Sequence, residues 1–448
     1  MPNAPLIEFL TAACVPRHGA HSAGTLQRAE AILAAHPTLA VASVHAAAVL
    51  GDAARVERFL AADPGAATRP APPHGWDPLT GLCFSNYLKL DQSRSDGFVR
   101  AATALLDAGA SANTGFHEPG HAPEPTFESA LYGACGVAHH AALTRLLLAR
   151  GADPNDEEVP YHAAEGYDNA ALMVLIESGR LTADSLATLL LRKCDWHDVD
   201  GVRLLLAAGA DPGRLSRWSP NALLHALTRD NSLELIERLL DHGADPRAVG
   251  PHGSAIRLAA GCGRGDVLRA LEHRGVPSAL VGADALVAAC ALGDAAAVQR
   301  AARADPDAVA VVRGLGAHLL TRFAGVGNVE GVGLLLDLGV PVDTRLVPGP
   351  GYFRVPVGST ALHIAAWRAR HETVAMLLAR GAAPDVRDAD GCSPLMLAVR
   401  ACVDSYWATR RAPDSVAHLL AAGAAVNGVP FPSGYREVDA LLSAHGAR

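Results

Sequence analysis

The chain of 448 residues is too long for one compact core, so either several domains or an open array of repeats is expected. Half of the residues are hydrophobic but only 5% are aromatic, which favours closely packed helices over a large core built around aromatic rings. The net charge of −8 is spread along the chain without long runs of one sign, which argues against a nucleic-acid-binding surface or a polybasic membrane patch.

The N-terminal sequence and the cysteine content favour a cytoplasmic protein with reduced cysteines. The N-terminal sequence Met-Pro-Asn-Ala-Pro lacks a basic segment before an apolar stretch, so no signal peptide is expected. The eight cysteines lie far apart and form no C-x-x-C pair, which predicts small packing residues rather than disulfides or a zinc site. Lys89 and Lys193 are the only lysines, a bias towards arginine that is typical of a bacterial genome rich in GC. No cofactor or metal is expected.

In chain order, residues 1–38 are expected to form a degenerate or capping repeat. Short Ala-rich helices are then expected at 43–52, 285–294, 361–367 and 394–399. Each is followed by a second helix that ends in a shared pattern, Leu-Leu-x-x-Gly-Ala-Asp-Pro or a close variant. The Gly of this pattern, or the residue in its place, falls at 36, 63, 109, 151, 179, 209, 243, 275, 305, 339, 381 and 423. Compact neighbours in this series are 30–34 residues apart, so the pattern marks about twelve units.

The shared pattern has a direct physical meaning. Its Gly can adopt the left-handed conformation that ends a helix, and the Pro that often follows cannot continue one. The paired leucines and an apolar residue one turn earlier, such as Val202 or Val374, give the helix a single buried face. Two short helices with one apolar face each cannot bury those faces alone, so stacking of units is expected to bury them.

These residues resemble a known family. The sequence Gly-Ser-Thr-Ala-Leu-His-Ile-Ala-Ala at 358–366 resembles the T-P-L-H-x-A signature of ankyrin repeats, and 391–398 resembles it without the His. The resemblance implies an all-α fold, an ankyrin-repeat solenoid of about twelve helix-turn-helix units with short or irregular β-hairpin fingers. It implies a repeat array over 39–432 and a capping helix in 433–448. It also implies that His45, His225 and His363 bond to backbone within their repeats.

Departures from the pattern are the features most informative about function. The loops at 110–126 and 340–359 are long, and insertions separate the two helices of a unit at 85–97, at 403–412 and around 15–24. Insertions in solenoids tend to lie on the binding side, although neutral drift in surface loops explains them equally well.

Aromatic residues without an evident core position, together with nearby arginines, are candidates for the binding of a partner, because Trp, Tyr and Arg dominate interface energetics. The alternative is that each aromatic fills a gap between units. The candidate partner-binding residues are Trp76, Phe116, Phe127, Tyr161, His162, Arg192, Trp196, Arg217, Trp218, Tyr352, Phe353 and Trp367.

Two segments match or resemble catalytic motifs in sequence, but the structure expected around each does not suit the chemistry. His117-Glu118-Pro119-Gly120-His121 fits the zinc motif H-E-x-x-H, but Pro119 and Gly120 oppose the helix that the motif requires. The cluster of residues 194–198 replaces an ordinary turn between helices, where neighbours in sequence rarely form a catalytic geometry.

The resemblance therefore implies a non-catalytic scaffold or adaptor, a cytoplasmic monomer that binds another protein through its concave face and fingers. Neither nucleic acid nor a membrane is an expected partner. A regulator or inhibitor of a bacterial enzyme, similar to an antitoxin, is one alternative. A further alternative is an enzyme with a site in the groove between Tyr161 and His197, which would need titratable groups with displaced pKa values.

Overall fold

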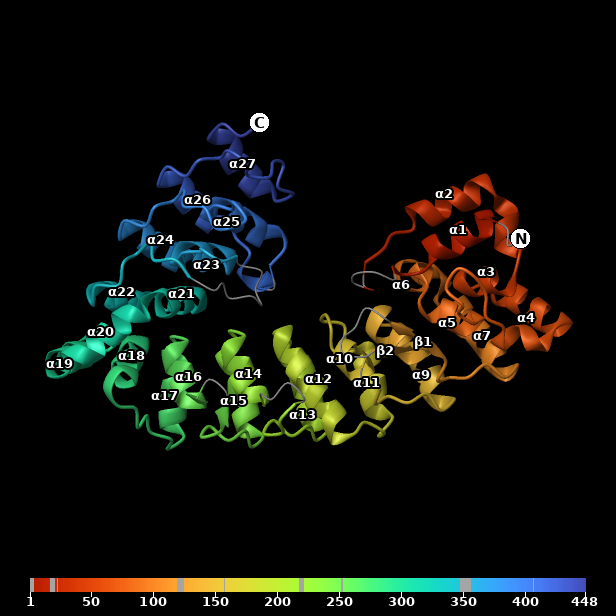
Figure 1. The fold of residues 1–448 in the computed structure, drawn as a ribbon, viewed down its shortest axis with the longest axis horizontal. Helices are drawn as coiled ribbons and strands as arrows, with labels where there is room; N and C mark the ends of the chain where they lie inside the picture. The colour runs from red at the N-terminus through yellow and green to blue at the C-terminus, as the bar shows by residue number, and fades with distance from the viewer. Residues whose placement is uncertain are drawn as a thin grey trace. The chain divides into compact units, whose positions relative to one another are not determined.

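The protein is represented by a computed structural model. The structure describes residues 4–16, 21, 23–118, 125–156, 158–216, 221–250, 253–346, 356–405 and 407–448. The chain divides into two compact units, Met1–Trp218 and Ser219–Arg448. Figure 1 shows the order of the helices within each unit.

The first unit consists of short helices and one hairpin. Its helices are α1 (Ala4–Ala13), α2 (Gln27–Ala35), α3 (Val44–Val49), α4 (Ala53–Ala62), α5 (Pro78–Cys83), α6 (Asn86–Leu90), α7 (Ser95–Asp107), α8 (Ala130–Tyr132), α9 (Ala141–Ala149), α10 (Glu158–His162), α11 (Ala170–Glu177), α12 (Ala183–Asp195) and α13 (Val199–Ala207). A π-helical turn at Gly133–Val137 extends α8. The antiparallel hairpin pairs β1 (Gly115–Glu118) with β2 (Thr126–Ser129).

The second unit continues in the same manner. Its helices are α14 (Ala222–Thr228), α15 (Leu233–Asp241), α16 (Ala255–Gly261), α17 (Gly265–His273), α18 (Gly282–Leu292), α19 (Ala295–Ala304), α20 (Pro306–Gly314), α21 (Gly316–Val326), α22 (Val329–Asp337), α23 (Ala361–Trp367), α24 (His371–Ala379), α25 (Pro394–Val403), α26 (Asp414–Ala421) and α27 (Arg436–Ala444). Its hairpin pairs β3 (Val249–Gly250) with β4 (Gly253–Ser254).

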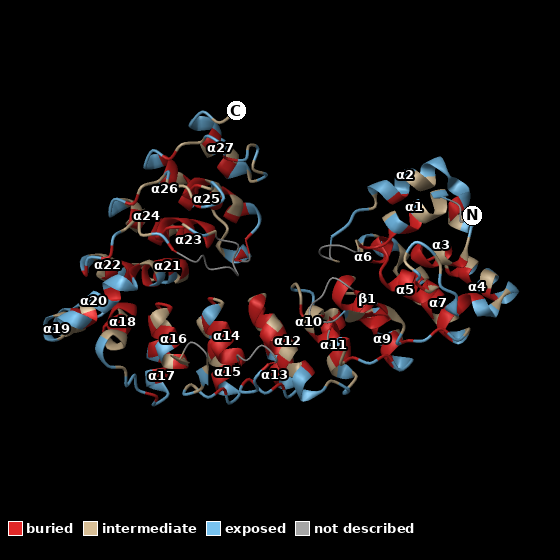
Figure 2. Cartoon of the chain, viewed as in Figure 1, coloured by how far each residue is buried: buried red, intermediate tan, exposed pale blue. Residues whose placement is uncertain are grey.

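Twelve helix pairs can be followed through the described residues, and α27 follows the last pair. First helices pack on first helices, such as α21 on α23 and α23 on α25, and second helices pack on second helices, such as α24 on α26. Figure 2 shows α23 as buried and the loops between repeats as mainly exposed. The predicted all-α repeat solenoid with short β-hairpin fingers is confirmed.

The same interactions begin and end the helices in successive repeats. The glycines of the shared pattern all adopt positive φ, for example 94° at Gly243 and 85° at Gly381. At helix starts, side-chain oxygens accept hydrogen bonds from backbone N–H groups, as Asp198 does from Gly201. His363 bonds to Thr360 on one side and to the carbonyl of Cys392 on the other, so its predicted role within the repeat is confirmed.

Two helices of the structure were not predicted from the sequence. The insertion between α5 and α7 forms the short helix α6, and an additional helix, α20, precedes α21. Helix α20 carries no copy of the shared pattern of its own, so the pattern did not predict it as a separate helix. The division into 1–38, 39–432 and 433–448 stays a prediction. All eight cysteines are free thiols, and seven of them are buried.

Across the described residues, no single helix has the length and apolar character needed to cross a membrane, but α20 and α21, bent by 73° at their junction, meet those criteria as a pair.

Candidate functional site

Three of the predicted partner-binding residues are core residues, and the expectation that they are exposed is wrong. Trp76, Phe116 and Trp367 are 5%, 8% and 2% exposed. Trp76 stacks on Phe116 with ring centroids 4.6 Å apart, although each belongs to a loop or finger in sequence. Trp367 packs into a cluster with Ile364 and Trp407. Each ring therefore packs between neighbouring repeats, which was the alternative explanation.

Four other candidates, Arg217, Trp218, Tyr352 and Phe353, lie outside the described residues, and their role stays a prediction. Phe127 is half-buried on β2, where its ring lies 5.1 Å from that of His117.

The remaining four candidates come together in the first unit. Tyr161 and His162 end α10, whereas Arg192 and Trp196 lie at the C-terminal end of α12, and all four are half-buried. The guanidinium of Arg192 lies 4.1 Å from the centroid of the Tyr161 ring, and its Nε donates to the Tyr161 carbonyl at 3.2 Å. Arg192 and Trp196 are four residues apart, so they lie on neighbouring turns at one side of the helix end.

Two carboxylates fix the position of Arg192. Its Nη2 lies 2.8 Å from Oε1 of Glu165, and its Nη1 lies 2.6 Å from Oδ2 of Asp195. The arginine side chain is only 13% exposed, so these contacts are poorly screened by water. A planar guanidinium held at both ends in this way keeps one orientation over the tyrosine ring.

His162 lies between two further carboxylate contacts. Its Nε2 is 3.1 Å from Oε2 of Glu158, and its Nδ1 is 3.1 Å from Oε1 of Glu165. Burial would lower the pKa of His162, but the hydrogen bonds to Glu158 and Glu165 outweigh it and raise the pKa to about 9. His162 is therefore a cation at neutral pH and part of the same ion-pair network as Arg192.

Tyr167 completes this surface and was not among the residues predicted from the sequence. Its side chain is 53% exposed, and its ring meets Trp196 edge-on at a centroid distance of 6.1 Å. The signal was its place in the turn between α10 and α11, where a large aromatic has no core to enter. We call Tyr161, Tyr167, Arg192 and Trp196 the aromatic–arginine surface.

A buried lysine holds the turn that carries Tyr167. Lys193 is fully buried, and its Nζ donates to the Gly166 carbonyl and to Oδ2 of Asp198, each at 2.9 Å. Asn169 donates to the same carboxylate at 2.8 Å. Burial lowers the pKa of Lys193, opposed by the Asp198 carboxylate. The turn is thus fixed from below while its aromatic side chain stays accessible.

Titratable groups with displaced pKa values lie close to His162. Burial, and next the charge of Glu158, raises the pKa of Glu128 to about 7. The Tyr132 hydroxyl lies 3.0 Å from Nδ1 of His21. Among the described residues no group of three potential ligands could hold a metal ion. His117 and Glu118 of the H-E-x-x-H match lie on strand β1 rather than on a helix, and the rest of the match lies outside the described residues.

Comparisons with known proteins found similarity to ankyrin repeats over part of the chain. The family model described as ankyrin repeat matches residues 357–389, the unit that contains α23 and α24. This segment of the chain is therefore similar to ankyrin repeats. A mouse protein, ankyrin repeat domain-containing protein 9, is 42% identical over 64 residues, which are 14% of this chain and 20% of the mouse protein. The crystal structure of the human ASB11 ankyrin repeat domain is 18% identical, covers 58% of this chain and 98% of its own, and has a TM-score of 0.26.

Ankyrin repeats are generally modules of protein–protein interaction and generally lack catalytic activity. In this chain the ends of the first helices and the turns that follow them recur from repeat to repeat. The aromatic–arginine surface lies at two successive positions of this kind, the ends of α10 and α12.

Proposed function

We propose that this ankyrin repeat protein is a non-catalytic scaffold or adaptor of the cytoplasm that binds another protein through the aromatic–arginine surface. The observation that carries the proposal is the Arg192 guanidinium held over Tyr161 by Glu165 and Asp195. Tyr, Trp and Arg are the residues that most often dominate binding energy at protein interfaces. The protein acts as a monomer, and neither nucleic acid nor a membrane is its partner.

These side chains are already held in fixed positions, which lowers the entropic cost of binding a partner. Immobilising a flexible side chain at an interface costs about 0.5–1.5 kcal/mol. Arg192 has already lost this freedom through its two ion pairs, and Lys193 fixes the turn beside it. A partner that stacks on Tyr167 and Trp196 would therefore meet a surface whose shape is set before binding.

An adaptor and an inhibitor of an enzyme would use the same surface and differ only in the partner. The enzyme alternative draws on the displaced pKa values of Glu128 and His162. Burial and ion pairs with neighbouring glutamates account for both shifts, and such networks also occur where they only stabilise a fold. Binding is the function that the half-buried rings and the fixed arginine support best.

Affinity purification from the native cell tests the proposal. The bait is the full chain, compared with the double variant Tyr161→Ala/Trp196→Ala and with Met173→Ala. Met173 is the matched control because it is 41% exposed on α11, the second helix of the same repeat. We expect the same protein to be retained by the wild type and by Met173→Ala and to be lost with the double variant. Equal recovery by all three baits, or no retained protein, would overturn the proposal.

A further inference from the structure

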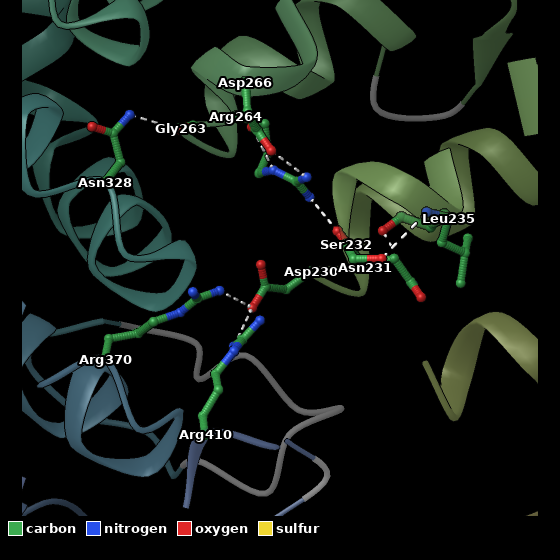
Figure 3. Close-up of polar contacts among 11 residues, drawn as sticks. Asp230, Asn231, Ser232, Leu235, Gly263, Arg264, Asp266, Asn328, Arg370 and Arg410 are labelled. Atoms are coloured by element: carbon green, nitrogen blue, oxygen red, sulfur yellow. Dashed lines mark hydrogen bonds and ion pairs between the residues drawn. The ribbon is translucent and has the colours of Figure 1, made fainter. Parts of the chain in front are cut away.

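The turn between α14 and α15 carries a buried carboxylate that arginines from distant repeats of the same unit surround. Asp230 is 4% exposed, and its φ of 55° places it in the left-handed region that glycine fills at equivalent turns, such as Gly263 and Gly327. Its Oδ2 lies 2.8 Å from Nη2 of Arg370 and 3.4 Å from Nη1 of Arg410. Figure 3 draws both contacts as dashed lines.

Two further arginines complete the group. Nη1 of Arg368 lies 4.0 Å from Oδ2 of Asp230. Arg264 contributes to the field at Asp230 while its Nη1 donates to the Asn231 carbonyl at 2.7 Å and its Nη2 pairs with Asp266 at 2.7 Å. We call Arg264, Arg368, Arg370 and Arg410 the arginine cluster. Together with Asp230 and Asp266, these side chains carry a net charge of +2.

Two members of the arginine cluster stand at positions where other repeats have a residue that caps the helix. Arg264 and Arg370 occupy the N-cap positions of α17 and α24, and neither side chain caps its helix. At the equivalent position of other repeats, Asp198 and Asn328 accept a hydrogen bond from the backbone. An arginine there forgoes the cap and brings a positive charge to the positive end of the helix dipole. Local preferences of this kind are overridden most often where residues serve a function.

The members of the arginine cluster differ in their exposure to solvent. The side chains of Arg370 and Arg410 are 19% and 26% exposed, whereas those of Arg264 and Arg368 are 5% and 9% exposed. Burial, followed by the charge of Arg370, lowers the pKa of Arg410 to about 10. Like charges that are partly removed from water attract an anion more strongly than exposed arginines do.

We propose that Arg370 and Arg410, supported by the charges of Arg264 and Arg368, form a binding site for a dianionic phosphate group. The two N–H edges of a guanidinium match the oxygens of a phosphate, and a charge of −2 balances the net charge of the cluster. Asp230 holds the two open guanidiniums in position from the buried side. The site lies in the second unit, so it is independent of the aromatic–arginine surface and of the function proposed for it.

Titration of the full chain with inorganic phosphate, followed by ³¹P NMR, tests the site. The variants are Arg410→Gln and, as the matched control, Arg303→Gln, which removes one exposed arginine from α19 of the same unit. We expect saturable binding that is weakened about tenfold or more by Arg410→Gln, because a charge-assisted hydrogen bond is lost. Arg303→Gln should bind as the wild type does. Absence of saturable binding to the wild type, or equal binding by both variants, would overturn the proposal.

Two additions make the test sharper. Arg410→Lys keeps the charge but not the planar fork, so we expect affinity between those of Arg410→Gln and the wild type, with an unchanged circular dichroism spectrum for each variant. Titration with a phosphoserine peptide and with its unphosphorylated form then separates the sources of the phosphate. Tighter binding of the phosphopeptide than of inorganic phosphate indicates a phosphorylated protein, and equal binding indicates a small phosphate compound. Equal binding of both peptides would contradict a phosphate site.

Discussion

Nη2 of Arg370 lies 2.8 Å from Oδ2 of Asp230, although 140 residues of chain separate the two. In a linear array each repeat contacts only its neighbours. Here the turn after α14 is bonded to the turn before α24 and to the insertion that carries Arg410. The ion pairs around Asp230 therefore link the beginning of the second unit to its last repeats.

Replacement of Asp230 should destabilise the second unit strongly. Asp230→Asn keeps the size and the tolerated left-handed backbone but leaves the buried arginines without their shared carboxylate. We expect the free energy of unfolding in urea to fall by about 3–5 kcal/mol, the usual cost of breaking a buried ion pair.

The matched control for this variant is Asp241→Asn, which breaks an ion pair with Arg274 in which the side chains are 57% and 34% exposed. This pair should contribute less than about 1 kcal/mol. If the two variants were equally stable, the ion pairs of Asp230 would not hold the unit together.

The repeat register predicts the cost of a core truncation. Leu377 on α24 is fully buried, so Leu377→Ala should lower the free energy of unfolding by about 2–5 kcal/mol. Val311→Ala, at a position 49% exposed on α20, should change it by less than about 0.5 kcal/mol. Urea denaturation followed by circular dichroism measures both, and a small loss for Leu377→Ala would contradict the assigned register.

The stability of the first unit should decrease above neutral pH. Burial opposes the charge of His162, but Glu158 and Glu165 raise its pKa from 6.5 to about 9 in the folded chain. The stabilisation is thus complete below pH 6.5 and is lost as the pH rises through 9, with a total of up to about 3 kcal/mol.

His162→Gln should remove that decrease. The difference in unfolding free energy between wild type and variant, measured by urea denaturation from pH 6 to pH 9.5, should shrink as the pH rises. A constant difference across this range would show that the ion pairs of His162 with Glu158 and Glu165 do not contribute to stability.

The sequence predicted the repeat array well because its signals are local. The glycine of the shared pattern, such as Gly243 or Gly381, follows the paired leucines and ends the helix, since glycine adopts positive φ at little cost. The contact of Arg192 with Tyr161 could also be predicted from the sequence, because both residues lie at the ends of successive first helices. About twelve units and the terminal helix followed from these signals alone.

The remaining features depend on contacts between distant residues. Trp76 and Phe116 belong to loops in sequence, yet they fold back and stack on one another. The arginines around Asp230 come from repeats far apart in the chain, and no local pattern marks their convergence. Tyr167 was missed for a different reason, because a turn residue acquires a role only from its neighbour Trp196 in the folded chain.

Site-specific photo-crosslinking tests the central claim most directly. A photoreactive phenylalanine analogue at position 167, which is 53% exposed within the aromatic–arginine surface, is compared with the same analogue at position 173 on α11. On irradiation in the native cell, the chain should form an adduct of higher mass with a protein partner from position 167 and not from position 173. Adducts from position 173 alone, or equal adducts from both positions, would contradict the binding of a partner at this surface.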